Sequence, residues 1–191
     1  MSAERRTIQL RAARADDWFD KVEASAPNFE QLCDAIGRKF VAFALVAGVR
    51  ITSLAIDPRN PENTQVTFGV GAQTDDDTMG LAEFRRALTQ ALVQPEEVMA
   101  PPSDLDNVDN QQKYLGVRYL LLAPILGITV QELHVGGDRE PTVVIGLGSL
   151  TDEVSIEEFR EVIREAVRRE EQAARPQRPF AIDLGKIPEA D

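Results

Sequence analysis

Two stretches of the chain alternate apolar and polar residues in the way that β-strands with one buried face do. They span Ile51–Gly71 and Val130–Gly148. In each stretch two alternating runs are joined by residues typical of turns, so each predicts a β-hairpin. In the first hairpin, the residues expected to face the core are Leu54, Ile56, Val66, Phe68 and Val70.

Helical patterns flank both hairpins. Apolar residues recur every three or four positions from Phe29 to Phe43, which predicts a helix with Asn28 as its N-cap and Gly48 at its end. After the first hairpin, an acidic turn at residues 74–78 is expected to lead into a second helix that ends before Pro95. The chain therefore has the order helix, strand, strand, helix.

The same order recurs after a constant shift along the sequence. Gly37, Phe40 and Gly48 correspond to Gly116, Tyr119 and Gly127 at an offset of 79 residues. This agreement predicts a duplicated α-β-β-α unit. The second copy differs in Pro124, which stands at the position of Leu45 and predicts a kinked or shortened helix, and in a capping box formed by Ser155 and Glu158.

An isolated two-stranded hairpin is marginally stable in water, so the two units are expected to share one sheet. The predicted fold is α+β, with a four-stranded antiparallel sheet, helices packed on one face and pseudo-twofold symmetry. The expected boundaries are an N-terminal arm at 1–27, unit one at 28–94, a linker at 95–109, unit two at 110–173 and an extended tail at 174–191.

Charge and composition narrow the possible partners. The net charge is −11, and arginines alternate with glutamates instead of forming a basic stripe, so nucleic acid is not expected as a partner. No apolar run is long enough to span a bilayer and no secretory signal is evident, which predicts a cytoplasmic location. The single cysteine, Cys33, excludes an internal disulfide and is expected to be a core thiol.

Candidate chemistry is sparse. His134 is the only histidine, and its position predicts that it faces away from the helix-covered side, as an ordinary exposed strand residue without a second ligand for zinc. The Gly69–Gly71 segment lacks the third glycine of a dinucleotide loop. Asp75–Asp77 lacks the spacing of an EF-hand loop. No cofactor, metal or catalytic residue is therefore predicted.

The second face of the predicted sheet is the candidate partner-binding surface. Glycine inside a strand often marks a twist, a bulge or the close approach of another backbone, and paired glycines recur in both hairpins. The apolar residues of the tail, which alternate with polar or small ones, form the other half of this prediction. The candidate residues are Ser53, Ala55, Thr67, Gly69, Gly71, Val144, Gly146, Gly148, Phe180, Ile182, Leu184 and Ile187.

These observations favour a non-enzymatic protein–protein interaction module, such as an acidic cytoplasmic adaptor, assembly factor or chaperone. Its partner would be another protein or a second copy, docked on the glycine-rich face or through the tail, which acts either in trans or in cis. One alternative is a structural subunit of a larger assembly. Another is an enzyme with a carboxylate-based site in the acidic loops, using pairs such as Asp76 and Asp152.

Overall fold

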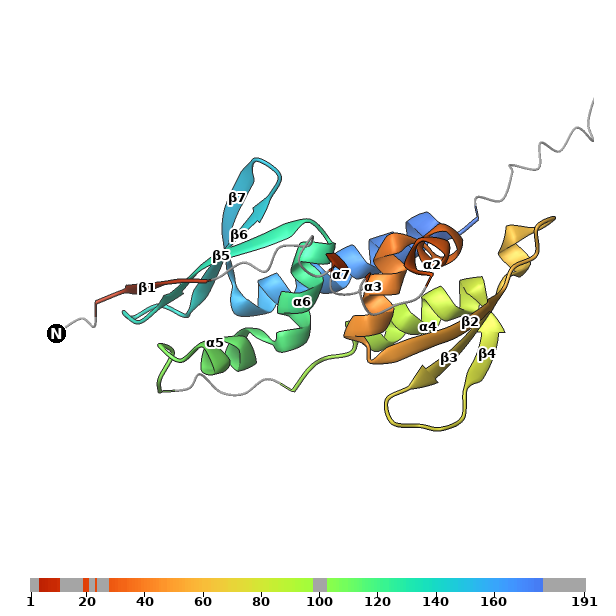
Figure 1. Ribbon diagram of the computed structural model, residues 1–191. Coiled ribbons are helices and arrows are strands. Elements are labelled where there is room, and N and C mark those ends of the chain that lie inside the picture. The colour runs from red at the N-terminus through yellow and green to blue at the C-terminus, as the bar shows by residue number, and fades with distance from the viewer. Residues whose placement is uncertain (1–3, 11–18, 21–22, 24–27, 98–102, 177–191) are drawn as a thin grey trace, which may run out of the picture.

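The computed structural model describes residues 4–10, 19–20, 23, 28–97 and 103–176. The protein is α+β, with two antiparallel sheets separated by helices (Figure 1). The three-stranded sheet has the order β2 (Val49–Ala55), β3 (Gln65–Val70), β4 (Asp77–Gly80). The four-stranded sheet has the order β1 (Arg6–Gln9), β5 (Ile128–Val135), β6 (Thr142–Leu147), β7 (Leu150–Ser155).

The helices follow the same order in both halves of the chain. In the first half (residues 28–97) they are α2 (Phe29–Ile36), α3 (Arg38–Val46) and α4 (Leu81–Val93), with a short 3-10 helix, η1 (Pro61–Asn63). In the second half (residues 103–176) they are α5 (Val108–Leu115), α6 (Val117–Ile125) and α7 (Ile156–Ala174).

The prediction of one sheet shared by both hairpins is wrong. Each hairpin gains its third strand locally, because the acidic segment expected to be a turn forms β4 and its counterpart in the second half forms β7. The N-terminal strand β1 then pairs with β5 (Arg6 opposite Val135), which adds a fourth strand to the second sheet. With these additions each hairpin belongs to a sheet of its own and does not need the other for hydrogen bonding.

The expected continuous helix up to Gly48 is also wrong, because it is divided at Gly37. That glycine has a φ of 101°, which favours glycine over residues with a side chain, and Gly116 divides α5 from α6 with a φ of 98°. Asn28 does not cap the first helix with its side chain; it has a left-handed φ of 71°. Pro124 lies in the last turn of α6 and does not shorten it, since Ile125 and Val46 end the two helices at the same offset of 79.

A β-bulge changes which residues of the first hairpin face the core. The pairing of β2 with β3 shifts between Ile51 and Ser53, so Val66 and Phe68 are buried and Leu54 is half-buried. Ile56 and Val70, expected in the core, are each 41% exposed. A bulge inserts one residue, so alternation counted along the sequence changes face at that point.

Other local predictions are confirmed. Helix α4 ends at Val93, before Pro95. Ser155 accepts a hydrogen bond from the Glu158 amide, and the Glu158 side chain accepts one from the Ser155 amide, which completes the capping box of α7. No helix in the described part of the chain is both long and apolar enough to cross a membrane.

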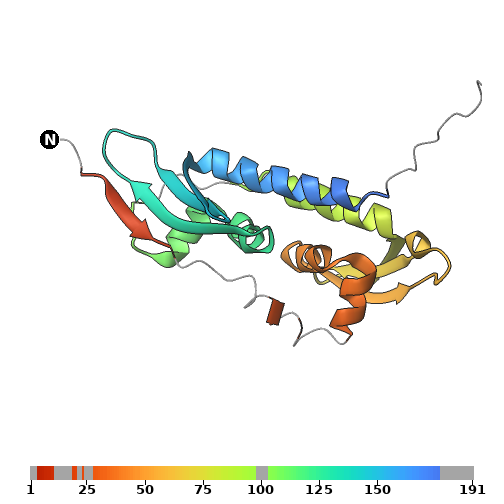
Figure 2. The ribbon, with the colours of Figure 1, turned by 90° about the horizontal axis from the view of Figure 1, so that it is seen from above.

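The core lies where the helices of the two halves meet. Helix α3 contacts α6, and α4 contacts α7, with the sheets directed towards opposite ends (Figure 2). Fully buried side chains on these four helices include Phe43, Phe84, Leu122, Phe159 and Ile163. Because one face of each sheet also packs against these helices, the free strand edges and the outer sheet faces are the surfaces left for function.

Candidate interaction surface

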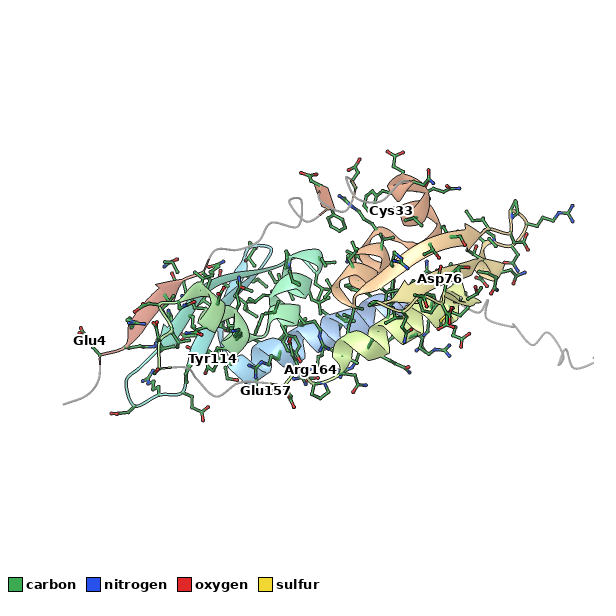
Figure 3. The ribbon with its side chains drawn as sticks, turned by 60° about the horizontal axis from the view of Figure 1, so that its bottom comes forward. Glu4, Cys33, Asp76, Tyr114, Glu157 and Arg164 are labelled. Carbon is green, nitrogen blue, oxygen red and sulfur yellow. The ribbon has the colours of Figure 1, made fainter. Side chains whose placement is uncertain are left out.

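The outer face of the three-stranded sheet carries the first group of predicted site residues. Gly69 lies opposite Arg50, whose guanidinium is 3.8 Å from the Asp76 carboxylate (Figure 3 labels Asp76). A Cβ added at Gly69 would lie 2.8 Å from Asp76 Oδ1 and 3.1 Å from Arg50 Nη2. The missing side chain is thus replaced by an ion pair of the protein itself, and the glycine does not leave a bare surface.

The other residues predicted on this sheet lie in different settings. Ser53 and Ala55 are exposed at the end of β2, whereas Thr67 Oγ1 is 3.0 Å from Thr78 Oγ1 on the neighbouring strand. Gly71 has a φ of 57° just after β3, where no atom lies within 4 Å of an added Cβ. It is a turn glycine and does not belong to the sheet face.

The four-stranded sheet repeats this arrangement. An added Cβ at Gly146 would lie 2.4 Å from Thr129 Oγ1 and 2.8 Å from Gln131 Nε2, so side chains of β5 occupy the space above it. Gly148, with a φ of 61°, lies in the turn between β6 and β7. Val144 is half-buried, opposite Glu132 on one side and Glu153 on the other.

The same outer face holds a polar cluster centred on His134, which the sequence did not predict. The side chain of His134 is only 14% exposed. Its Nε2 is 3.1 Å from Glu132 Oε2, and its Nδ1 is 3.1 Å from Glu153 Oε1. Arg5 and Thr142 also bond to Glu153. His134 does face away from the helices, as predicted, but it is enclosed by carboxylates from strands that the sequence did not place beside it.

Hydrogen bonds within this cluster keep its carboxylates ionised. Those from Thr142 and His134, with a further contribution from Arg5, lower the pKa of Glu153 to about 2. The Gln9 amide, at 2.7 Å, and His134 lower the pKa of Glu132. The cluster links β1, β5, β6 and β7 by side chains. Within the described ranges, no three His, Cys, Asp or Glu side chains gather as a metal site would require.

The other candidate acidic groups are not brought together. Asp76 belongs to the turn before β4 on the three-stranded sheet, whereas Asp152 lies on β7 of the four-stranded sheet and accepts a hydrogen bond from the Glu153 amide. Cys33 lies on α2 and is half-buried, and burial raises the pKa of its thiol (Figure 3). Phe180, Ile182, Leu184 and Ile187 lie outside the described residues.

The free edge of β2 is the feature that sequence reasoning missed. No described strand pairs with this edge, whereas the corresponding edge of β5 is covered by β1. Beside β2 runs an apolar cavity of about 730 Å³, bounded by α2, α3 and the strand itself. We call it the edge groove; its apolar lining includes Leu32, Val41, Leu45, Val49, Ile51 and Leu54.

The second half has a groove at the same position, and β1 reaches into it. That cavity, of about 440 Å³, is lined by Leu120, Pro124, Ile128 and Val130, each 79 residues after a lining residue of the edge groove. Gln9 and Leu10 from the N-terminal strand line it as well. The Leu10 amide donates a 2.8 Å hydrogen bond to the Gln131 carbonyl. The two grooves therefore differ in whether a strand lies along their edge.

Exposure of apolar side chains follows this difference. Leu45 is 38% exposed in the edge groove, whereas its counterpart Pro124 is half-buried. Ile56 is 41% exposed, whereas its counterpart Val135 packs against the core, opposite Arg6 of β1. The offset of 79 was visible in the sequence, but the pairing of β1 with β5, which makes the comparison informative, was not.

Comparison of the chain with protein-family models, with curated proteins and with solved structures gives no match.

Proposed function

We propose that this protein is a non-enzymatic protein–protein interaction module that receives an extended segment of a partner as a strand added to β2. The observation that carries the proposal is the free β2 edge next to the edge groove. In strand addition, main-chain hydrogen bonds along a sheet edge supply affinity, and alternate side chains fill adjoining pockets. The proposed site moves from the glycine-rich face, where Gly69 and Gly146 are crowded by the protein's own side chains, to the edge of the sheet.

The composition of the edge strands favours β2 over the other edges. Proteins protect exposed edges from unwanted pairing by making them short or by placing charges on them. Strands β1 and β4 have four residues each, and β7 carries Asp152 and Glu153. Strand β2 has seven residues with Arg50 as its single charged side chain. It is therefore the longest and least charged of the edge strands.

The bulge in β2 does not disqualify it. Bulges commonly blunt the edges of sheets. However, β5 has its register shift between Val130 and Glu132, at the same offset as the shift between Ile51 and Ser53, and it still pairs with β1. A strand of this geometry is thus compatible with a neighbour on its outer side, as the pairing with β1 demonstrates for β5.

We further propose that the two halves are a duplicated unit related by pseudo-twofold symmetry. Support comes from a contact that recurs in each half. Arg85 donates hydrogen bonds of 2.9 and 2.6 Å to the Ile36 carbonyl at the end of α2. Arg160 donates to the carbonyls of Tyr114 (2.6 Å) and Leu115 (3.3 Å) at the end of α5. Each arginine thus satisfies backbone carbonyls left free by the glycine that divides the helix pair.

Within this class, an acidic adaptor, assembly factor or chaperone in the cytoplasm accords with the net charge of −11. A structural subunit that self-associates is the second candidate, because the same edge can accept a strand from another copy. It is distinguished by its oligomeric state: light scattering at several concentrations would give a constant monomer mass for an adaptor and a rising mass for a self-associating subunit.

The proposal can be tested with two substitutions of matched exposure. Leu45 is 38% exposed in the edge groove, and Val162 is 39% exposed on α7, in a different groove next to the four-stranded sheet. Proteins that copurify with the tagged protein at native abundance are compared for wild type, Leu45→Asp and Val162→Asp. We expect Leu45→Asp to lose about 90% or more of a specific partner, since a charge in an apolar pocket costs more than about 1.4 kcal/mol.

Circular dichroism and urea unfolding of both variants provide the control for folding, and both should resemble wild type because both positions are partly exposed at the start. Equal retention of partners by Leu45→Asp and wild type would refute docking at the edge groove. Selective loss in Val162→Asp would assign docking to the other groove and would equally refute the proposal.

A further inference from the structure

The described part of the chain ends beside the free edge of β2. Ala174 and Pro176, just after α7, line a cavity of about 690 Å³ together with Ile56 and Gln31. Ile56 directly follows β2, and Gln31 also lines the edge groove. Arg175 is paired with the buried Glu171 at 2.8 Å, which fixes the direction in which α7 ends. The 15 residues that follow therefore start at the C-terminal end of β2.

Their sequence resembles the strand that covers the corresponding edge of β5. Residues 6–10 are RTIQL, in which Ile8 and Leu10 pack against the core. Residues 180–184 are FAIDL. Isoleucine and leucine occupy the same third and fifth positions, and the fourth residue between them is polar in both. This alternation is what a strand with one face on an apolar groove requires.

The register of β1 can be transferred by the offset between the halves. Ile8 lies opposite Leu133, whose counterpart is Leu54, and Arg6 lies opposite Val135, whose counterpart is Ile56. The same register places Ile182 opposite Leu54 and Phe180 opposite Ile56.

We propose that residues 180–184 of the same chain occupy the β2 edge as an antiparallel strand, with Ile182 and Leu184 directed into the edge groove. The inference rests on the docking edge proposed above and names its resident occupant. Four residue steps separate Pro176 from Phe180, a reach of up to about 13 Å at roughly 3.3 Å per residue. Because this segment starts at the end of β2 and must run back along it, the geometry selects antiparallel pairing, which is also the direction of β1 against β5.

Side chains on the other face of the added strand fit this register as well. Ala181 comes opposite Ala55 and Asp183 opposite Ser53, so only small residues face each other across the strands. Phe180 covers Ile56, which is otherwise 41% exposed. A partner that docks at β2 must then displace a segment tethered to the same molecule, whose effective concentration is in the millimolar range for a short flexible linker.

The test compares two full-length variants by residue-resolved amide hydrogen exchange. Ile182→Asp places a charge on the groove side of the proposed strand, and Ala181→Asp is the matched control on its other side. The amides of β2 that do not bond to β3 report whether the edge is covered. We expect them to exchange at least about tenfold faster in Ile182→Asp, because the variant loses the burial of one large aliphatic side chain. In Ala181→Asp and wild type they should exchange at the same slow rate.

A peptide with the sequence of residues 178–187, added in excess to Ile182→Asp, should restore slow exchange at the same amides. Equal exchange of β2 in Ile182→Asp and wild type would overturn the proposal. Protection in wild type that increases with protein concentration would assign the edge to a second copy and would also overturn it. Failure here with continued loss of partner in Leu45→Asp removes only the occupant; the converse removes only the proposed function.

Discussion

Substitution of Gly146 by alanine tests why glycine occupies the outer sheet faces. A Cβ at this position would lie 2.4 Å from Thr129 Oγ1 and 2.8 Å from Gln131 Nε2. Two of the three staggered positions on the threonine Cβ carry heavy atoms, and Oγ1 is held by a 3.3 Å hydrogen bond to the Gly146 carbonyl. The clash is therefore not relieved by a free rotation of Thr129.

The magnitude follows from two opposing effects. Extra atoms forced into a packed site cost about 1–3 kcal/mol. Replacement of glycine by alanine where the backbone conformation suits both stabilises by roughly 0.5 kcal/mol, because the unfolded chain loses freedom. We expect Gly146→Ala to lower the free energy of unfolding by about 2 kcal/mol. In a Thr129→Ala background the same change should be neutral or slightly stabilising.

Urea unfolding of wild type, both single variants and the double variant gives the coupling energy, expected at about 2 kcal/mol. Gly69→Ala is the comparator. Its added Cβ meets Asp76 and Arg50 at 2.8 and 3.1 Å, both at the ends of longer side chains that can move, so it should cost less than Gly146→Ala. An equal cost of Gly146→Ala with and without Thr129 would refute the crowding argument. A stable Gly146→Ala protein that fails to bind a partner would instead favour close approach by another backbone.

Three further predictions concern stability and reactivity. Because the folded pKa of Glu153 is lowered from 4.5 to about 2, its stabilising contribution is complete above pH 4.5 and is lost as pH falls towards 2; Glu153→Gln should flatten the fall of the urea midpoint in that window. Arg160→Ala should cost about 3 kcal/mol in urea unfolding, since it leaves two buried carbonyls without their charged donor, whereas the exposed Arg169→Ala should cost less than about 0.5 kcal/mol; similar costs would contradict the capping role. Burial raises the pKa of the Cys33 thiol, so iodoacetamide should alkylate it more slowly than a free cysteine near pH 8, and equal rates would contradict this.

Local features of this chain were predictable because they depend on neighbours in sequence. The capping box of Ser155 and Glu158, the end of α4 before Pro95 and both hairpins follow from contacts within a few residues. The division of α2 from α3 at Gly37 was missed because glycine inside a helical pattern is tolerated in some helices and ends others. Its signal was present in the recurrence of glycine at position 116.

The candidate site was only partly accessible in this way. The strand glycines were correctly located, yet what lies above Gly69 is an ion pair between Arg50 and Asp76, and the partner of an ion pair on another strand has no signature in spacing. The cluster around His134 likewise combines residues separated by more than a hundred positions, as in the contact of Arg5 with Glu153.

The alternation of apolar residues, by itself, determined that this chain contains two antiparallel hairpins with helices around them, because burial of one strand face is recorded at every second position. Only the tertiary structure decided that the hairpins lie in separate sheets and that β1 covers β5 while no described strand covers β2. Main-chain hydrogen bonds between strands are nearly independent of side-chain identity, so a sequence specifies that a strand forms far more clearly than which edge it leaves free.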